Sequence, residues 1–178
     1  WLFWAQSLGR WDGRGGVWCI TSEDSQTRAP TWSAPRRLCD GVMLNKPTVL
    51  SSGACLLPVS VWARPADPAT PPEHRHDLAA ESGANVHAFR DGGQSLAKLG
   101  QVRVPQREYD EHSIIERRDG SLWMLVRAPY GMAESESTDG GMTWSEPGPS
   151  PIRHVNSRFC IRRLTSGNLL LITHEPPH

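Results

Sequence analysis

The feature that most constrains this sequence is the segment STDGGMTW at residues 137–144, which has the pattern S-x-D-x-G-x-T-W. Side chains of Ser and Asp accept hydrogen bonds from the backbone N–H groups of a tight turn, and glycine supplies backbone conformations with positive φ. The Thr143 and Trp144 that end the segment are residue types that favour strands. The segment therefore predicts a turn closed by its own side chains, followed by a strand that a tryptophan anchors.

Three other segments share one layout, in which an apolar strand is followed by a short glycine turn and a second apolar strand. The turns contain Ser52-Gly53, Asp119-Gly120 and Ser166-Gly167, and such dipeptides are typical of short β-hairpin connections. The flanking strands are expected at residues 47–50 and 56–57, at 112–115 and 122–125, and at 158–161 and 169–171. The spacing of the turns is near that of a four-stranded propeller blade once one insertion is removed.

That insertion is predicted at residues 63–85, where prolines recur among polar residues and favour a long surface loop. A second pair of strands is expected later in each unit, around the turn motif or its remnants at residues 22–32 and 89–93. This pattern predicts one partial propeller domain over residues 1–178. Its parts are a partial blade at 1–40, a blade with the inserted loop at 41–106, a blade at 107–153 and a partial blade at 154–178.

The motif at residues 137–144 resembles the Asp-box, or bacterial neuraminidase repeat (BNR), of the sialidase-like superfamily. The resemblance implies an all-β fold, here a partial β-propeller of four-stranded antiparallel blades, with about three blades of a six-bladed ring. A propeller closes its ring, so a chain that starts without Met and covers so few blades is expected to be a fragment of a longer polypeptide. A self-contained β-sandwich is the alternative that the length allows.

Composition excludes several classes of function. The 19 basic and 19 acidic side chains balance, so nothing favours nucleic acid as a partner. No apolar run is long enough for a membrane span. The four cysteines lack metal-ligand spacing, and we expect no metal and no cofactor. The family resemblance alone suggests a secreted or periplasmic location.

Propeller geometry selects the candidate site, because residues before each first strand and after each second strand converge on one face. The segment Asp110-Glu111-His112 precedes a first strand and could divide acid and base roles in catalysis. Adjacent strand residues point to opposite faces, so either Glu111 alone or Asp110 with His112 should face the site. The alternative is that Asp110 caps the strand and His112 bonds a neighbouring blade. Loops after second strands also carry polar and aromatic residues, among them Trp11, Trp62, Arg64 and His174.

Two arginines stand in apolar strand contexts, where a charge is costly unless it meets a partner. Arg127 and Arg158 are therefore predicted to bind a substrate carboxylate, as an arginine cluster does in sialidase-like enzymes. Structural pairing of these arginines with Glu134 or Glu116 is the alternative. Tyr130 with Glu134 superficially resembles the sialidase nucleophile pair, so Tyr130 is a candidate ligand contact or nucleophile and Glu134 a substrate contact. Lys46 and His174 are further candidate substrate contacts.

Together these residues favour a carbohydrate-active enzyme, an exo-acting glycoside hydrolase of the sialidase-like type on an acidic sugar. Its partner would be an anionic glycan or oligosaccharide. Two alternatives remain open at this point. One is a propeller polysaccharide lyase acting on uronate-containing glycans. The other is a non-catalytic glycan-binding propeller, since this fold hosts many functions.

Overall fold

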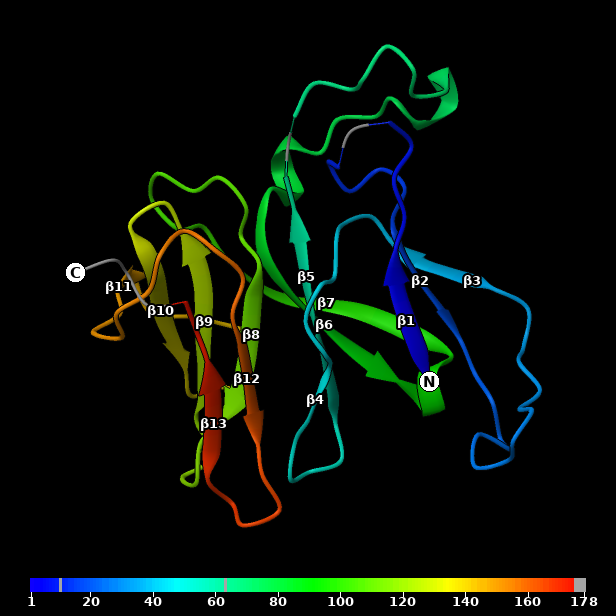
Figure 1. Ribbon diagram of the computed structural model, residues 1–178. Coiled ribbons are helices and arrows are strands. Elements are labelled where there is room, and N and C mark those ends of the chain that lie inside the picture. Colours follow the sequence, from blue (N-terminus) through cyan, green and yellow to red (C-terminus); the bar gives the residue numbers. More distant parts are fainter. Residues whose placement is uncertain (10, 63, 175–178) are drawn as a thin grey trace.

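The computed structural model describes residues 1–9, 11–62 and 64–174, and antiparallel β-strands dominate these ranges (Figure 1). The described strands form four separate sheets, and in each the strand order follows the chain. The first sheet contains β1 (Leu2–Ala5), β2 (Val17–Ile20) and β3 (Arg36–Cys39). The second contains β4 (Thr48–Val49), β5 (Cys55–Val61), β6 (Gly83–Arg90) and β7 (Ser95–Val102). The third contains β8 (His112–Glu116), β9 (Leu122–Ala128), β10 (Gly131–Ser137) and β11 (Gly148–Pro149). The fourth contains β12 (Cys160–Arg163) and β13 (Leu169–Ile172).

The three predicted glycine hairpins are confirmed as β4–β5, β8–β9 and β12–β13. Their turn glycines have nearly the same backbone conformation, with φ of 85° at Gly53 and Gly120 and 84° at Gly167. A side chain is strained at such a φ, which explains the glycine in each turn. The repeat in the sequence is therefore a repeat of turn geometry.

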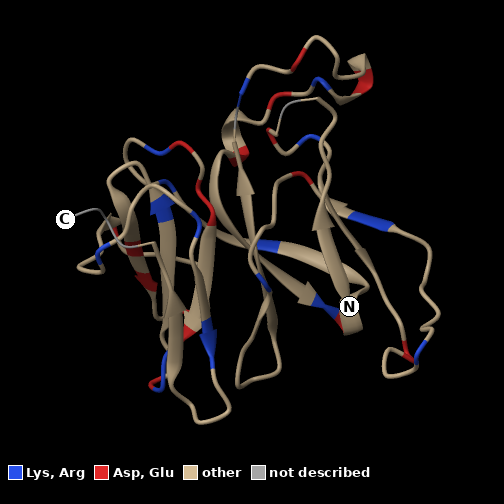
Figure 2. Ribbon diagram, in the orientation of Figure 1, with Lys and Arg blue, Asp and Glu red and all other residues tan. Residues whose placement is uncertain are grey.

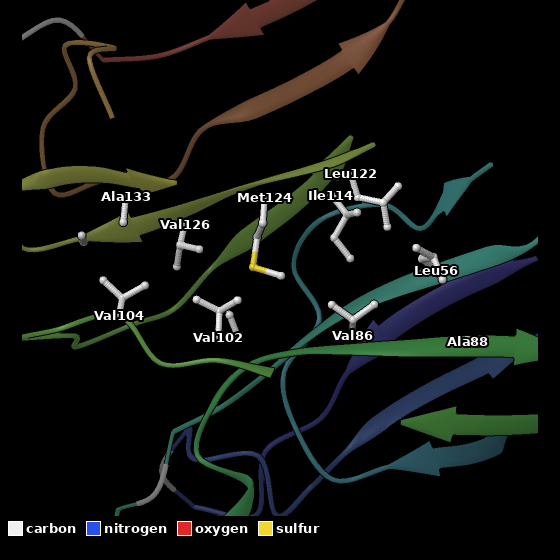
Figure 3. Close-up of a cluster of buried hydrophobic side chains, with 12 residues drawn as sticks. Leu56, Val86, Ala88, Val102, Val104, Ile114, Leu122, Met124, Val126 and Ala133 are labelled. Atoms are coloured by element: carbon white, nitrogen blue, oxygen red, sulfur yellow. The ribbon is translucent and has the colours of Figure 1, made fainter. Parts of the chain in front are cut away.

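Buried side chains alternate between the two faces of the central strands, because each middle sheet packs against a neighbour on both sides. On β9, Met124 and Val126 join a cluster with the second sheet, whereas Leu125 packs with Phe159 near the fourth. On β5, Leu56 and Leu57 divide in the same way between the third sheet and the first. Figure 3 shows side chains of β8, β9 and β10 facing those of β5, β6 and β7. The core thus lies between successive sheets, which is how propeller blades pack.

The Asp-box turn lies between β10 and β11, the third and fourth strands of its sheet. Asp139 accepts hydrogen bonds from the backbone N–H groups of Met142 and Thr143 at 3.0 and 2.9 Å and from the Thr143 hydroxyl at 2.6 Å. These donors lower the pKa of Asp139 to about 2, with the Thr143 hydroxyl the largest cause. The Trp144 indole donates to the Gly141 carbonyl at 3.0 Å and packs against the cluster between the second and third sheets. The motif is structural, as expected.

The inserted segment differs in extent from the prediction. Strand β5 ends at Val61 and β6 begins at Gly83, so residues 83–85 belong to a strand rather than to the loop. Asn85 is completely buried there, and its side-chain amide donates to the carbonyls of Glu81 and Gly83. The intervening loop contains two short 3-10 turns, η1 (Pro72–His74) and η2 (Ala79–Glu81). Ala63, predicted in the loop, and residues 175–178 of the predicted last partial blade lie outside the described residues.

The prediction of an all-β partial propeller with four-stranded antiparallel blades is confirmed, since two complete four-stranded sheets lie between two smaller ones. The described part contains no helix long and apolar enough to cross a membrane. Strands β5 and β9 end on the same side of the molecule, at the top of Figure 1, and β1 runs in the same direction. The loops that follow these three strands therefore gather at one end of the sheets.

Candidate functional site

A cavity of about 550 Å³ lies at this end of the sheets. Its lining consists of Trp11, Leu44, Trp62, Arg64, Tyr109, Glu111 and Arg127. These residues come from segments that follow β1 and β5, from the end of β9, and from the segments that precede β4 and β8. Charged residues occur throughout the loops at this end (Figure 2). The lining is apolar over most of its area but carries two guanidinium groups and one carboxylate, a composition suited to a polar, charged ligand.

Arg127 and Glu111 form the polar centre of the cavity. Arg127 Nη1 lies 3.2 Å from Glu111 Oε2, and both side chains are largely buried. The two backbones are also paired, because Arg127 N donates to the Glu111 carbonyl at 2.9 Å. Arg127 Nε donates to Asn156 Oδ1 at 2.8 Å, and Nη2 donates to the Asn156 carbonyl at 3.2 Å. Contacts from two sides therefore hold the guanidinium in one orientation.

Aromatic rings form the other part of the lining. The Tyr109 ring meets the Trp62 ring edge to face, with centroids 5.1 Å apart. The guanidinium carbons of Arg64 and Arg127 lie 4.7 and 5.2 Å from the Tyr109 centroid, within the range of cation–π attraction. Trp62 Nε1 is buried and has no hydrogen-bond partner within the described residues. Of the aromatic residues in the lining, Trp11 is exposed, whereas Trp62 is buried.

Asp110 and His112 do not line the cavity, in contrast to Glu111 between them. His112 is almost completely buried. Its Nδ1 lies 3.1 Å from Ser60 Oγ, and its Nε2 lies 3.0 Å from the Asn85 carbonyl oxygen. Asp110 is equally buried and pairs with Arg107 at 3.1 Å. Burial raises the pKa of Asp110 to about 6 although Arg107 opposes the shift. The sequence interpretation in which Glu111 alone faces the site matches this geometry.

Neither Tyr130 nor Glu134 is among the residues that line this cavity. Tyr130 lies in the turn between β9 and β10 with 42% of its surface exposed, and partial burial raises the pKa of its phenol. Glu134 lies on β10, where its Oε2 accepts hydrogen bonds from Trp123 Nε1 and Ser150 Oγ, both at 3.1 Å. Arg127 pairs with Glu111 instead of Glu134. The carboxylate of Glu134 therefore joins strands within its own sheet.

Lys46, Arg158 and His174 line a different hollow, of about 780 Å³, along the first strands β4, β8 and β12. Arg158 Nη2 donates to the Leu44 carbonyl at 2.7 Å, and Leu44 lines both hollows. Arg127 and Arg158 thus lie beside neighbouring hollows and do not share one. The sequence predicted that both arginines bind one substrate carboxylate. These contacts do not place the two guanidinium groups in one cavity.

Sequence reasoning missed Tyr109 and Leu44 as parts of the cavity. Tyr109 stands directly before Asp110, and its position beside the strand entry was the available signal. Leu44 is an apolar residue and offered no such signal; its carbonyl accepts a hydrogen bond from Arg158 Nη2.

The buried histidines predict a pH dependence of stability. Burial lowers the pKa of His87 and His112 to about 4, so both are neutral in the fold. Each contributes stability that is fully present above the unfolded pKa near 6.5 and is lost as the pH falls toward 4, about 3 kcal/mol per group. Asp110 acts in the opposite sense, because its raised pKa contributes stability that is lost as the pH rises through about 6.

We expect the free energy of unfolding, measured by urea denaturation, to fall by about 3 kcal/mol between pH 7 and pH 4.5. The variant Asp110→Asn places a group beside Arg107 that does not titrate and so removes the opposing contribution, and its loss of stability over the same interval should therefore be larger. A stability that stays constant over this interval in both proteins would contradict the burial of neutral histidines.

Comparisons with known proteins add to these observations. The model of the family described as BNR repeat-like domain matches residues 1–178. A search of curated proteins finds no match. Among solved structures, a protein of unknown function from Dyadobacter fermentans is similar, with a TM-score of 0.65 and 15% identity. That match covers 88% of this chain and 43% of the other chain.

Two further solved structures are sialidases by name. A K499G mutant of NanB sialidase from Streptococcus pneumoniae matches with a TM-score of 0.61 and 18% identity, over 87% of this chain and 23% of that one. The intramolecular trans-sialidase from Ruminococcus gnavus, in complex with oseltamivir carboxylate, matches with a TM-score of 0.59 and 18% identity, over 88% and 33%. This chain therefore spans less than half of the length of each of these structures, and at such identities the likeness shows the fold alone.

Proposed function

Because this chain belongs to the family of BNR repeat-like domains, we propose that it forms part of the substrate site of an exo-acting glycoside hydrolase of the sialidase-like type. Its substrate is a glycan that ends in an acidic sugar. The resemblance to sialidase-like propellers predicted from the Asp-box is confirmed by the family match and by the sialidase neighbours. One of those neighbours was solved with a ligand named as a carboxylate, which is consistent with the proposal.

The observation that carries the proposal is the Arg127–Glu111 pair in the cavity beside Tyr109 and Trp62. A guanidinium held by Asn156 keeps N–H donors in a fixed orientation, and such a group suits a sugar carboxylate. The exposed Trp11 ring in the lining provides an apolar surface for the sugar ring. Among the described residues that line the cavity, Glu111 is the only carboxylate, so we assign the proton transfer to it.

The remaining candidates take no part in this proposal. Asp110 and His112 are enclosed behind the cavity, and Lys46, Arg158 and His174 belong to the adjacent hollow. Tyr130 is exposed in a turn at the end of β9, so we do not assign it the role of nucleophile. No contact among the described residues favours a polysaccharide lyase over a hydrolase. The lyase and the non-catalytic glycan-binding protein are therefore treated as outcomes of the experiments below.

The proposal is tested with two acidic fluorogenic substrates, glycosides of sialic acid and of glucuronic acid. A fluorogenic galactoside, whose sugar is neutral, serves as the comparison. We expect the protein to release the fluorophore from an acidic glycoside and not from the galactoside. Replacing Arg127 by glutamine should lower kcat/KM for the acidic substrate about 10- to 100-fold, because a charge-assisted hydrogen bond contributes roughly 1.5–3 kcal/mol.

Arg118→Gln is the matched control, since Arg118 is exposed in the β8–β9 turn at the opposite end of β9. This variant should retain the activity of the original protein. If Arg127→Gln and Arg118→Gln had equal activity, Arg127 would not be a substrate-binding residue. Turnover of the neutral galactoside alone would overturn the assignment of an acidic substrate.

A further inference from the structure

Three buried polar side chains, Ser60, Asp110 and His112, join the second and third sheets next to Glu111. Each of the three is at most 2% exposed. Ser60 lies on β5, His112 begins β8, and Asp110 lies two residues before His112. Burying polar groups costs free energy unless they are hydrogen-bonded, so the contacts of these side chains indicate their role.

The contacts centre on the carbonyl oxygen of Asp110. The Ser60 hydroxyl donates a hydrogen bond to this oxygen, and His112 Nδ1 lies 3.0 Å from it. On its other side the His112 ring reaches β6, because Nε2 lies 3.0 Å from the Asn85 carbonyl oxygen. Two strands of the second sheet thus hold one peptide group of the segment before β8.

That peptide group fixes the backbone of Glu111 on one side, since the Asp110 carbonyl and the Glu111 N–H belong to the same planar unit. Glu111 N donates to the Tyr109 carbonyl at 2.8 Å, and the Glu111 carbonyl accepts a hydrogen bond from Arg127 N at 2.9 Å. The peptide groups on both sides of the Glu111 Cα are therefore held. Because the backbone sets the direction of the Cα–Cβ bond, these contacts determine which way the Glu111 side chain points.

The side chain of Asp110 adds a further attachment to the second sheet. Arg107 Nη1 lies 3.1 Å from Asp110 Oδ2, and Arg107 Nη2 donates to Ser82 Oγ, directly before β6. Asp110 is thereby kept on the buried side, while Glu111 lines the cavity. Turning this segment so that Asp110 faced the cavity would break these contacts.

We infer that Ser60 and His112 are positioning residues, which hold the backbone of Glu111 from the neighbouring sheet so that its side chain lies beside Arg127 in the cavity. The inference rests on the proposed role of Glu111 in proton transfer. It adds that the placement of this group depends on the packing of two sheets against each other. A group that transfers a proton must lie within hydrogen-bond reach of its substrate, so a small displacement lowers the rate.

Ser60→Ala tests the inference, because it removes the hydroxyl that binds the Asp110 carbonyl. We expect kcat on an acidic glycoside to fall about 10-fold, while KM stays within about twofold. In a protein that already carries Glu111→Gln, the same replacement should change the residual kcat by less than about twofold, because Ser60 acts through Glu111. Equal fold-changes in the two backgrounds would overturn the inference.

His112 is tested by two replacements of different chemistry. Asparagine keeps a polar amide near the place of Nδ1, so His112→Asn should retain a kcat several-fold higher than His112→Leu. His87→Gln is the matched control, because His87 is also a buried histidine, and no described contact joins its ring to the Asp110 carbonyl by a hydrogen bond. This variant should keep kcat within about twofold. Equal kcat in His112→Asn and His112→Leu would mean that His112 is not a positioning residue.

A measurement without substrate tests the placement of Glu111 separately from the proposed hydrolase. Hydrogen exchange followed by NMR reports on the amides of Glu111 and Arg127, whose hydrogen bonds lie on the two sides of the Glu111 Cα. Ser60→Ala should speed exchange at both amides about 10-fold or more relative to amides in the middle of β9, and His87→Gln should leave it unchanged. Unaltered exchange in Ser60→Ala would overturn the inference, even if the protein hydrolyses acidic glycosides. Faster exchange in a protein that turns over no glycoside would uphold the positioning of Glu111 and overturn the proposed hydrolase.

Discussion

Replacing Glu111 by glutamine is expected to lower kcat on an acidic glycoside by about 10²- to 10⁴-fold, the range that general acid–base catalysis contributes. The amide can still accept a hydrogen bond from Arg127 Nη1, so the cavity should keep its shape. It cannot carry a proton to the leaving oxygen. KM for the same substrate should therefore change much less than kcat.

Glu136→Gln is the matched control for this prediction. Glu136 is a carboxylate on β10 that pairs at the surface with Arg117, and it does not line the cavity. Its variant should retain full activity, because an exposed ion pair contributes little. If Glu111→Gln kept the original kcat, the proton transfer would belong to another group.

The products of the same assay separate the open alternatives. A lyase leaves an unsaturated uronide that absorbs in the near ultraviolet, whereas a hydrolase leaves none. A glycan-binding protein would show affinity for acidic sugars but no turnover, and Glu111→Gln would then alter binding alone. Each of these outcomes would overturn the hydrolase proposal.

Replacing Met124 by alanine is expected to lower the free energy of unfolding by about 2–5 kcal/mol, the cost of truncating a large buried side chain. Met124 is completely buried on β9, within the cluster that joins the second and third sheets (Figure 3). The truncation removes its contacts with the facing sheet and leaves a void that the strands of two sheets cannot easily close. Chemical denaturation of the two proteins measures the difference.

Met142→Ala is the control for the core variant, because Met142 is 59% exposed in the Asp-box turn. Its effect should stay within about 0.5 kcal/mol, as is usual for surface substitutions. Equal effects at Met124 and Met142 would mean that the packing between the sheets contributes little to stability.

Much of the fold could be predicted because its signals are local. The pattern at residues 137–144 specifies hydrogen bonds that span at most a few positions, such as those from Met142 and Thr143 to Asp139. The glycine turns at Gly53, Gly120 and Gly167 likewise define their hairpins within short segments. The end of the insertion was misjudged because Asn85 is polar. Its burial depends on carbonyl partners that composition does not reveal.

The candidate site was predictable in outline. The expected convergence of loops on one face selected Glu111, Arg127 and Arg64, which line the cavity, but it also selected Lys46, Arg158 and His174, which line the other hollow. The sequence did not predict which residues these side chains pair with. It indicated Glu134 or Glu116 as structural partners of the arginines, but Arg127 pairs with Glu111, directly before β8, because the pairing of β8 with β9 places the two residues together.

The sequence by itself determined an all-β chain of repeated hairpins, because strand alternation and turn chemistry act over a few neighbouring residues. Only the tertiary structure decided that Glu111 lines the cavity while Asp110 and His112 are enclosed, and that Arg127 and Arg158 lie at separate hollows. It also decided that Arg14, in the loop after β1, donates hydrogen bonds to the Arg64 and His76 carbonyls of the insertion. These relations join segments far apart in the chain, so they depend on how the sheets pack.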